Sequence, residues 1–385
     1  MSKVRMGMVG GGEGAFIGAI HRMAAALDQE IELVCGAFSS NTERSRRSGA
    51  SLGLPDHRVY TSYELMMTAE SELPKEDRMQ FVSIVTPNHL HFPVAVAALK
   101  SGFHVLSDKP ATFSLSEVLT MRKIIEKCDL IYGLTHPYIG YPMVQEAQHR
   151  VSMGAFGRIR KILVDYNQGW LANDSIERES KQAAWRLDPS KAGISSCMGD
   201  IGVHAANLAE FVSGLRITEL CADLTSFVPG RELDDDGSVL LRFDGGAKGV
   251  LQASQICTGE ENALSLRVYG EKGGLEWSQQ NPNSLRLKWP DRPDEIVRTA
   301  ADYLSDSAAA ATRTPAGHPE GYLEAFANLY LAFATRVRVR EFGEGTDTAL
   351  FNCPGITEAV RGMAFIELAV TASQSDIKWH RFESH

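Results

Sequence analysis

The stretch VRMGMVGGGEGAFIG, residues 4–18, decides the fold of this chain. Residues 4–9 form a short apolar run typical of a buried strand, and the glycines that follow lead into a helical run that includes His21. A strand, a glycine turn and a helix in this order are the context in which glycines bind the pyrophosphate of a dinucleotide at a helix N-terminus. The stretch therefore predicts a dinucleotide-binding turn, with a glycine-rich turn that binds no ligand as the alternative.

The spacing of these glycines departs from the usual G-x-G-x-x-G pattern. Gly10 and Gly12 fit the first two positions, but the third is Ala15 and the next glycine is Gly18. The loop is therefore expected to be about three residues longer than usual. The residues expected to contact the cofactor here are Gly10, Gly12, Ala15, Phe16 and Ile17.

Apolar runs and helical stretches alternate over the first third of the chain. The further apolar runs are residues 31–38, 81–85, 102–106 and 130–134. Such alternation predicts an α/β fold with a doubly wound parallel sheet, a Rossmann domain over residues 1–135.

The second part of the chain has a different pattern. Strands are predicted at 159–168, 217–228, 238–243, 249–256, 263–268 and 285–289, and helices at 144–153, 203–213, 319–338 and 356–373. Many of the strands are joined by short polar turns, which is typical of a mostly antiparallel sheet. Residues 136–385 are therefore predicted to form an α+β domain with a large open sheet, one face of which is available to pair subunits.

A lysine follows one of the predicted parallel strands, in the stretch SDKPAT at residues 107–112. Ligands bind where the carboxyl ends of parallel strands meet, so Lys109 is a candidate catalytic residue. Asp108 is expected to hold the ammonium group, and Pro110 to fix the turn, with a cis peptide bond after Lys109 as one option. The alternative is an ordinary lysine in a surface loop.

Two other strand ends carry candidate cofactor contacts. The strand at 31–38 ends in Ser39 and Ser40, where an acidic residue normally binds the ribose of NAD, and arginines at positions 44, 46 and 47 follow. Serine and arginine suit a 2′-phosphate, which favours NADP over NAD, although a solvated helix face would have the same composition. The candidates are Ser39, Ser40 and Arg44, with Thr86, Pro87, Asn88 and His91 in the loop TPNHLH and Asp108, Lys109 and Pro110 in the lysine turn. His91 is equally suited to packing.

The stretch GDIGVHAANLAEF, residues 199–211, places a carboxylate and an imidazole four positions apart. On a helix this spacing puts Asp200 and His204 on one face, about one turn apart. A carboxylate can orient an imidazole in this geometry, and histidine suits removal of a proton from an alcohol near neutral pH. The alternative is a capping Asp200 and a His204 that serves only in packing.

Composition excludes several classes of protein. The formal net charge of −9 over 385 residues argues against a nucleic acid or an anionic membrane as partner. The six cysteines form no C-x-x-C pair and no metal-ligand spacing, so we expect reduced thiols, a cytoplasmic location and no metal site. The first residues contain no apolar run long enough for a signal peptide or a membrane span.

Taken together and in this order, the glycine turn with His21, TPNHLH, SDKPAT and GDIGVH resemble the motifs of the glucose-fructose oxidoreductase, inositol dehydrogenase and rhizopine-catabolism (Gfo/Idh/MocA) family. The family's E-K-P lysine motif matches Asp108, Lys109 and Pro110, with Asp in place of Glu, and its D-x-x-x-H motif matches Asp200 and His204. Ile139 stands where relatives often carry Arg. The resemblance implies catalysis by Lys109, Asp200 and His204, binding of NAD or NADP, a substrate domain, and homodimers or homotetramers that pack through the open sheet.

The expected reaction is hydride transfer between a nicotinamide and a secondary hydroxyl or ketone of a sugar, anhydrosugar or cyclitol. One alternative is a glycosidase or epimerase that uses tightly bound NAD transiently, and another is a dinucleotide sensor without catalysis. Aromatic and polar side chains suit a polyol, whereas Arg186 would also suit a carboxylated sugar. The expected substrate contacts are Lys109, His136, Tyr138, Tyr166, Gln168, Trp170, Trp185, Arg186, Asp200, His204 and His318.

Overall fold

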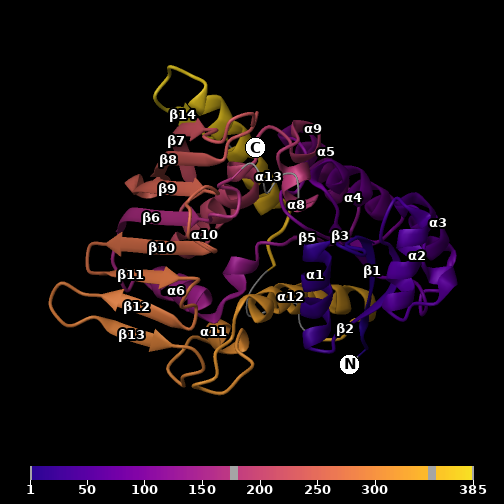
Figure 1. Cartoon of the computed structure of the whole chain (residues 1–385). Helices are drawn as coiled ribbons and strands as arrows, with labels where there is room; N and C mark the ends of the chain where they lie inside the picture. Colours follow the sequence, from indigo (N-terminus) through magenta and orange to yellow (C-terminus); the bar gives the residue numbers. More distant parts are fainter. Residues whose placement is uncertain (1, 174–180, 346–352, 384–385) are drawn as a thin grey trace. The chain divides into compact units, whose positions relative to one another are not determined.

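A computed structural model describes residues 2–173, 181–345 and 353–383. The chain divides into two compact units: the first comprises Met1–His136 and Phe326–Val360, and the second comprises Pro137–Ala325 and Arg361–His385 (Figure 1). The sequence predicts a single boundary at residue 135, whereas in the structure the chain returns to the first unit at Phe326–Val360. The sequence of this segment does not show which unit it packs on.

The first unit is built on a parallel sheet of five strands in the order β2-β1-β3-β4-β5. Its strands are β1 (Val4–Gly10), β2 (Ile31–Ala37), β3 (Phe81–Val85), β4 (His104–Ser107) and β5 (Tyr132–Leu134). The order reverses beside β1, and the carboxyl ends of strands on either side of such a switch point form a ligand crevice. Gly10, Thr86 and Asp108 all lie at or just beyond these ends.

Helices alternate with these strands, as the sequence predicts. They are α1 (Phe16–Leu27), α2 (Thr42–Ser51), α3 (Tyr63–Glu72), α4 (His91–Lys100) and α5 (Leu115–Ile125). The helix α12 (Tyr322–Phe342) contributes its residues from Phe326 onward to this unit, where the Phe333 ring packs on Phe81 at 5.1 Å between centroids. A Cβ on Gly133 of β5 would lie 2.7 Å from the Phe333 side chain, so the glycine allows the helix to approach the sheet closely.

The second unit contains a nine-stranded sheet in the order β13-β12-β11-β10-β6-β9-β8-β7-β14. Strands β6 and β9 run parallel, and the other neighbours run antiparallel, which confirms the mostly antiparallel sheet. The bounds are β6 (Ile159–Asn167), β7 (Ile217–Thr225), β8 (Asp236–Phe243), β9 (Lys248–Ser254), β10 (Ala263–Gly270), β11 (Gly274–Ser278), β12 (Ser284–Lys288), β13 (Glu295–Arg298) and β14 (His380–Arg381).

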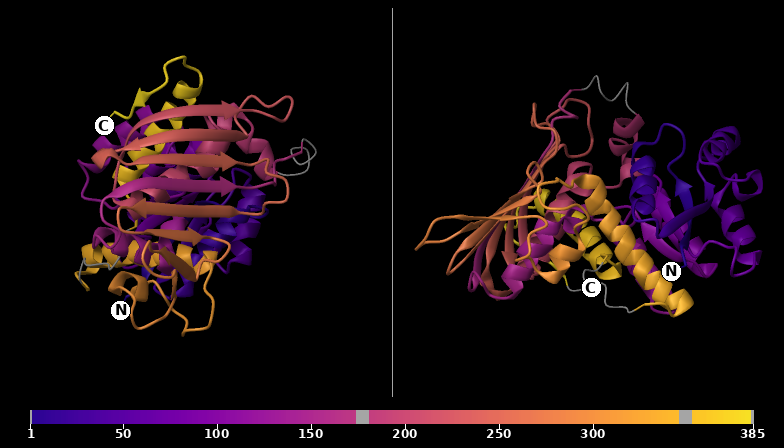
Figure 2. Two further views of the ribbon diagram at one scale, coloured as in Figure 1. Left: turned by 90° about the vertical axis from the view of Figure 1, so that its left-hand side faces the viewer. Right: turned by 90° about the horizontal axis from the view of Figure 1, so that it is seen from below.

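One face of this sheet is covered by helices and the other is open, as Figure 2 shows. Burial alternates along β6 and β8, the pattern of a sheet with one covered face. The helices of this unit are α6 (Pro142–Ser152), α8 (Lys181–Arg186), α9 (Pro189–Ala192), α10 (Val203–Ser213), α11 (Asp306–Ala310) and the part of α13 (Ile356–Ser373) from Arg361 onward.

Several sequence predictions need correction. Strands β11, β13 and β14 and helix α3 were not predicted, because each is short or lacks a clear apolar period. Helix α8, which contains Trp185 and Arg186, was not predicted either. Strand β6 ends at Asn167, one residue before the predicted end at Gln168, so Gln168 and Trp170 both lie beyond it.

Candidate functional site

The glycine turn after β1 has the backbone that a dinucleotide-binding turn requires. Gly10 and Gly11 have φ of +85° and +71°, a region that favours glycine. A Cβ on Gly18 would lie 2.3 Å from the Cα of Gly11, so Gly18 allows α1 to pack on the turn, the task of the third glycine in the usual pattern. No side chain caps α1 at Ala15, so the first-turn amides are suited to a pyrophosphate.

Carboxylates face two of the arginines that follow β2. Arg47 pairs with Glu13 at 3.1 Å and Arg46 with Glu43 at 3.6 Å. A 2′-phosphate would have to compete with these carboxylates for the guanidinium groups. The preference between NAD and NADP stays a prediction.

The loops after β3 and β4 are joined through a buried histidine, His91, the first residue of α4. Its Nδ1 lies 2.6 Å from the carbonyl oxygen of Pro110, and its Nε2 lies 2.8 Å from that of Thr86. Burial lowers the pKa of this imidazole, against the opposing influence of Asp108. Asn88 is also buried. Through His91, the TPN and DKP segments are connected to each other.

The carboxylate of Asp108 organises the turn that carries Lys109. Its Oδ1 accepts hydrogen bonds from the backbone N–H of Lys109 at 2.8 Å and from Oγ1 of Thr135 at 2.9 Å. The Lys109–Pro110 peptide bond is cis, the option considered from the sequence. Burial alone would raise the pKa of Asp108, but His21, Lys109 and His91 beside it lower that pKa well below the usual range. Asp108 is therefore an ionised group within the lysine turn.

His136 follows β5 and is buried close to the same charges. Burial, together with the cation of Lys109, lowers its pKa to about 3 against the opposing influence of Asp108. Its ring is therefore neutral at physiological pH. A neutral imidazole can donate one hydrogen bond and accept one, which suits contact with a hydroxyl group.

In the second unit, predicted substrate residues form a connected polar network at one edge of the sheet. Hydrogen bonds link the hydroxyls of Tyr138 and Tyr166, and Tyr166 donates to Oδ1 of Asn262 at 2.8 Å. Gln168 donates to the same oxygen at 2.7 Å, and Trp170 Nε1 donates to Oε1 of Gln168 at 2.9 Å. Burial raises the pKa of both tyrosines, so their hydroxyls remain protonated.

Arg186 and Asp200 form an ion pair in the same unit. Nε of Arg186 lies 3.1 Å from Oδ2 of Asp200, and Gln255 donates to that oxygen at 2.9 Å. The guanidinium also lies over the ring of Trp185, 4.3 Å from its centroid, and 5.8 Å from that of Trp170. Asp200 therefore neutralises the charge of Arg186, the residue predicted to suit a carboxylated sugar as well.

The helix that carries His204 begins with a π-helical turn, Met198–Gly202, which the spacing of Asp200 and His204 did not predict. A π turn has about 4.4 residues, so residues four apart no longer lie directly above one another. Asp200 lies within this turn, and the ring of His204 meets that of Tyr138 edge-on at 5.0 Å. Both residues thus adjoin the polar network of the second unit through different partners.

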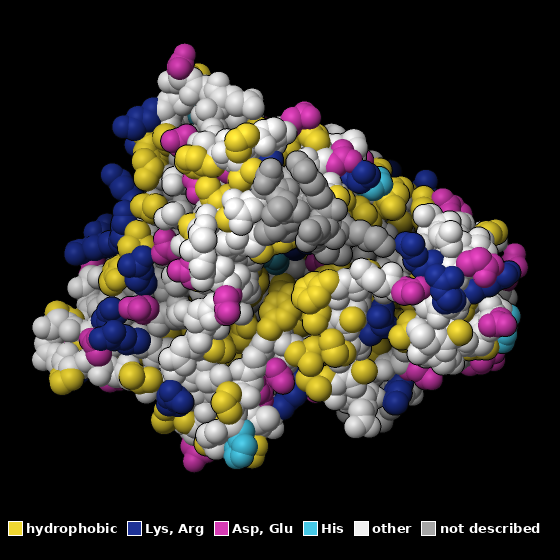
Figure 3. Space-filling view, viewed as in Figure 1, with side chains coloured by type: hydrophobic (Ala, Val, Ile, Leu, Met, Phe, Trp, Pro, Cys, Tyr) yellow, Lys and Arg dark blue, Asp and Glu magenta, His cyan; other side chains and the backbone are white. Residues whose placement is uncertain are grey.

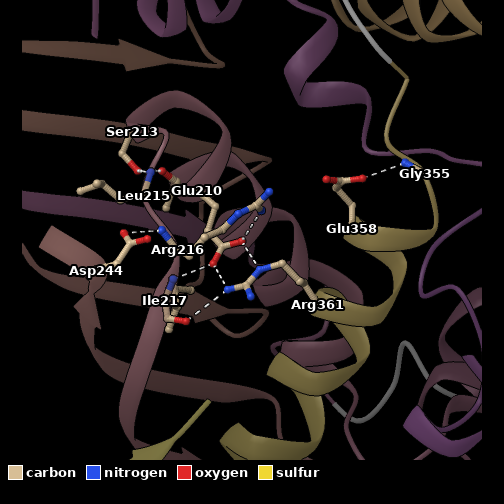
Figure 4. Close-up of polar contacts among 10 residues, drawn as sticks. Glu210, Ser213, Leu215, Arg216, Ile217, Asp244, Gly355, Glu358 and Arg361 are labelled. Carbon is tan, nitrogen blue, oxygen red and sulfur yellow. Dashed lines mark hydrogen bonds and ion pairs between the residues drawn. The ribbon is translucent and has the colours of Figure 1, made fainter. Parts of the chain in front are cut away.

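Both ends of this helical segment are fixed by buried carboxylates. Asp234 accepts hydrogen bonds from the backbone N–H groups of Ser196 at 2.9 Å and Met198 at 2.8 Å. Near the other end, Glu210 accepts from Nε of Arg361 at 2.7 Å and from the N–H of Ile217 at 2.7 Å (Figure 4). The orientation of Asp200 and His204 therefore depends on contacts far from them in the sequence.

His318 lies apart from this hydrogen-bonded network. It is exposed in the loop before α12, where its Nδ1 lies 3.2 Å from the carbonyl oxygen of Pro315. Its role as a substrate contact stays a prediction.

Sequence reasoning missed Asn262 and Gln255. Strands β6 and β9 are parallel neighbours and end together, and β10 is antiparallel to β6 and begins at the same edge. The residues just beyond these ends, Gln168, Gln255 and Asn262, must therefore lie at one edge of the sheet. Strand pairing was the signal that would have found them, and the sequence alone did not provide it.

Two family models match this chain. One is the oxidoreductase family with an NAD-binding Rossmann fold, over residues 4–136, and the other is the GFO/IDH/MocA C-terminal domain, over residues 144–276. The fold and these matches define an NAD-binding oxidoreductase. More particularly, the chain belongs to the Gfo/Idh/MocA oxidoreductase family, as its motifs indicated.

Two similar proteins extend over nearly the whole chain, and a third covers about three quarters of it. An inositol dehydrogenase homologue from Azotobacter vinelandii, solved in complex with NAD+, is 34% identical, with a TM-score of 0.95 and coverage of 99% of this chain and 98% of that one. An uncharacterized oxidoreductase of Bacillus subtilis, YfiI, is 32% identical over 99% of this chain and 97% of its own. A levoglucosan dehydrogenase from Pseudarthrobacter phenanthrenivorans is 24% identical over 74% of this chain and 76% of its own.

No helix within residues 2–173, 181–345 and 353–383 has both the length and the apolar character needed to cross a membrane.

Proposed function

We propose that this protein is a dehydrogenase of a neutral cyclitol or sugar, which oxidises a secondary hydroxyl group. The observation that carries this proposal is the network of Tyr138, Tyr166, Gln168 and Asn262, which consists of uncharged donors and acceptors. Such groups match the hydroxyls of a polyol. The pairing of Arg186 with Asp200 favours a neutral substrate over a carboxylated one.

The proposed roles follow the chemistry of each side chain. His204 takes the proton of the reacting hydroxyl, and Lys109 donates a hydrogen bond to the same oxygen and stabilises its developing negative charge. Asp200 is a positioning residue for this chemistry. Bound dinucleotide supplies the hydride acceptor, and the proposal requires that Lys109 and His204 act on one substrate molecule.

The relatives support a cyclitol as the first substrate to test. Another structure of an inositol dehydrogenase homologue from Azotobacter vinelandii, 33% identical to this chain with a TM-score of 0.92, is a complex with NADH and myo-inositol. The levoglucosan dehydrogenase supports anhydrosugars as the second class.

The test is the initial rate of dinucleotide reduction, with NAD and with NADP, against inositols, anhydrosugars, glycosides and sugar acids. Steady reduction with neutral polyols and none with sugar acids is expected. Preferential oxidation of sugar acids would contradict the proposal. Conversion of a glycoside without net dinucleotide reduction would instead establish transient use of the cofactor.

We further propose that two copies pair through the open face of the nine-stranded sheet. Cys221, Leu240, Val250 and Leu163 lie in register on four neighbouring strands and form an apolar row across this face. Asp223 and Asp165 lie in the adjacent row on one side, where Asp165 pairs with Arg267 at 2.9 Å. The row on the other side contains Arg242, Lys248 and Lys161 together with Glu219, the partner of Arg242, and keeps a net positive charge.

A twofold axis along the apolar row would place the acidic row of each copy opposite the basic row of the other. Figure 3 shows Lys and Arg side chains on this side of the sheet. We expect sedimentation to give a dimer or a larger even-numbered assembly, and Leu240→Glu to dissociate this interface. A wild-type monomer at micromolar concentration would contradict this part of the proposal.

We also propose that the protein is located in the cytoplasm. All six cysteines are free thiols, which is typical of proteins in a reducing compartment. Fractionation of cells that express the full chain would test this, and recovery outside the cytoplasm would contradict it.

A further inference from the structure

A buried chain of polar groups runs through the first unit behind the lysine turn. It begins at Ser83 on β3, whose Oγ lies 2.8 Å from the hydroxyl of Tyr330 on α12. That hydroxyl lies 2.7 Å from Nδ1 of His21 on α1. The chain ends where Nε2 of His21 faces Oδ2 of Asp108 at 3.7 Å, within the range of an ion pair.

The charge of Asp108 gives this chain its favoured direction. The side chains of Ser83, Tyr330 and His21 are essentially inaccessible to solvent. The distance of 3.7 Å is longer than a hydrogen bond, but an ionised carboxylate attracts a hydrogen on the Nε2 atom that faces it. With the hydrogen on Nε2 and none on Nδ1, Nδ1 accepts from the hydroxyl of Tyr330, which in turn accepts from Ser83.

The chain thus joins α12 to the lysine turn. Phe326, one turn before Tyr330 on the same helix, packs its ring on the imidazole of His21 at 4.6 Å. Residues 326 and 330 lie outside both segments that the family models match, which are residues 4–136 and 144–276. No motif therefore assigns Tyr330 a role.

We propose that His21 and Tyr330 are positioning residues for Lys109, acting through Asp108. Tyr330 fixes the tautomer and the ring orientation of His21, and His21 keeps the carboxylate of Asp108 ionised. The ionised carboxylate in turn fixes the backbone of Lys109 and the hydroxyl of Thr135. This inference rests on the proposed catalytic role of Lys109.

Other charges also act on Asp108 and must be separated from His21. Lys109 and His91 favour its ionised form, as His21 does, and burial opposes it. His136 also interacts with the pair formed by Asp108 and Lys109. Replacing His21 alone should therefore raise the pKa of Asp108 without removing every stabilising charge.

The experiment follows Asp108 directly, by a pH titration of protein with 13C-labelled aspartate carboxyls, in which Asp108→Asn identifies the signal. The variants are His21→Leu, His21→Gln and Tyr330→Phe. His21→Gln retains an N–H donor near the position of Nε2, and Tyr330→Phe retains the packing of the ring. His104→Gln is the matched control, because His104 is also buried, also faces a carboxylate (Glu341, at 3.2 Å), and begins β4 at the end opposite Asp108.

In His21→Leu we expect the pKa of Asp108 to be higher than in wild type. In His21→Gln we expect this pKa to lie closer to the wild-type value. The acid limb of the kcat/KM profile should move with it, while KM for the dinucleotide stays unchanged. Loss of the Tyr330 hydroxyl should lower kcat by about fivefold, the equivalent of one net hydrogen bond. His104→Gln should leave the Asp108 titration unchanged.

An unchanged Asp108 titration in folded His21→Gln and Tyr330→Phe, together with an unchanged kcat, would overturn the inference. So would an equal shift in His104→Gln, because it would indicate a general effect of losing a buried histidine. The titration needs no substrate, so it decides this inference even if no polyol is oxidised. Failure of the proposed function would appear separately, as absence of turnover by wild-type protein.

Discussion

Replacing Asp234 by Asn tests how the helix that carries His204 is fixed. The two carboxylate oxygens accept the N–H groups of Ser196 and Met198, one each. An amide of the same shape has one acceptor oxygen, so Asp234→Asn leaves one buried N–H facing an amide donor. A buried donor without a partner costs about 1–3 kcal/mol, which predicts a loss of about 2 kcal/mol in the unfolding free energy of the second unit.

Tryptophan fluorescence during urea unfolding measures this loss, because all five tryptophans lie in the second unit. With m of about 2 kcal/mol per molar urea, the midpoint should fall by about 1 M. Asp188→Asn is the matched control, because Asp188 caps α9 with its carboxylate in an exposed position and its loss should cost much less. An equal midpoint for wild type and Asp234→Asn would show that the Asp234 carboxylate does not stabilise this helix.

The same comparison predicts a pH dependence. Burial raises the pKa of Asp234 in the folded protein, against the hydrogen bonds from Met198, Ser195 and Ser196. The folded state therefore keeps its proton at pH values where the unfolded state, with a pKa of about 3.9, has lost it. Wild-type stability falls as the pH rises from the unfolded pKa through the raised folded pKa, and Asp234→Asn lacks this decline. The difference in unfolding free energy between wild type and Asp234→Asn should therefore shrink as the pH rises through that window. A difference that does not change with pH would contradict the raised pKa of Asp234.

Three further outcomes follow from ion pairs. Arg186→Gln removes the charged partner of Asp200, so kcat/KM for the polyol should fall by about tenfold in steady-state assays, and an unchanged value would mean that the pair plays no part in the site. Glu13→Gln releases Arg47, so the ratio of kcat/KM with NADP to that with NAD should rise, by at most about fivefold for an exposed pair; a fall would contradict the reasoning. Glu210→Gln weakens the contact with Arg361 and should destabilise the second unit by about 2 kcal/mol in the fluorescence assay, whereas equal stability would exclude that contact as an anchor.

Local patterns predicted much of the first unit. Strand β3 and its loop were recognised because five consecutive apolar or small residues, FVSIV, end in TPN, and the glycine turn has its own backbone signature. In the second unit, helix α10 was predicted at its observed bounds, because glycines and small apolar residues precede a regular helical run. These signals lie within about ten residues of sequence, the range over which propensity and capping act.

Features set by distant residues were not predictable in this way. Tyr330 reaches His21 across 309 positions of sequence, and the cap of the His204 helix comes from Asp234, beyond β7. The π turn at Met198–Gly202 has no signature in a pattern based on 3.6 residues per turn. Asn262 and Gln255 became candidates only once the pairing of β6 with β9 and β10 was known.

The proposed role of His204 is tested by comparing wild type with His204→Ala in NADH formation from myo-inositol, and from levoglucosan if inositol is not oxidised. We expect wild type to reduce NAD with a neutral polyol, and the variant, while still binding NADH, to turn over on the order of 10² to 10⁴ times more slowly. A His204→Ala protein with wild-type turnover would show that His204 is not the catalytic base.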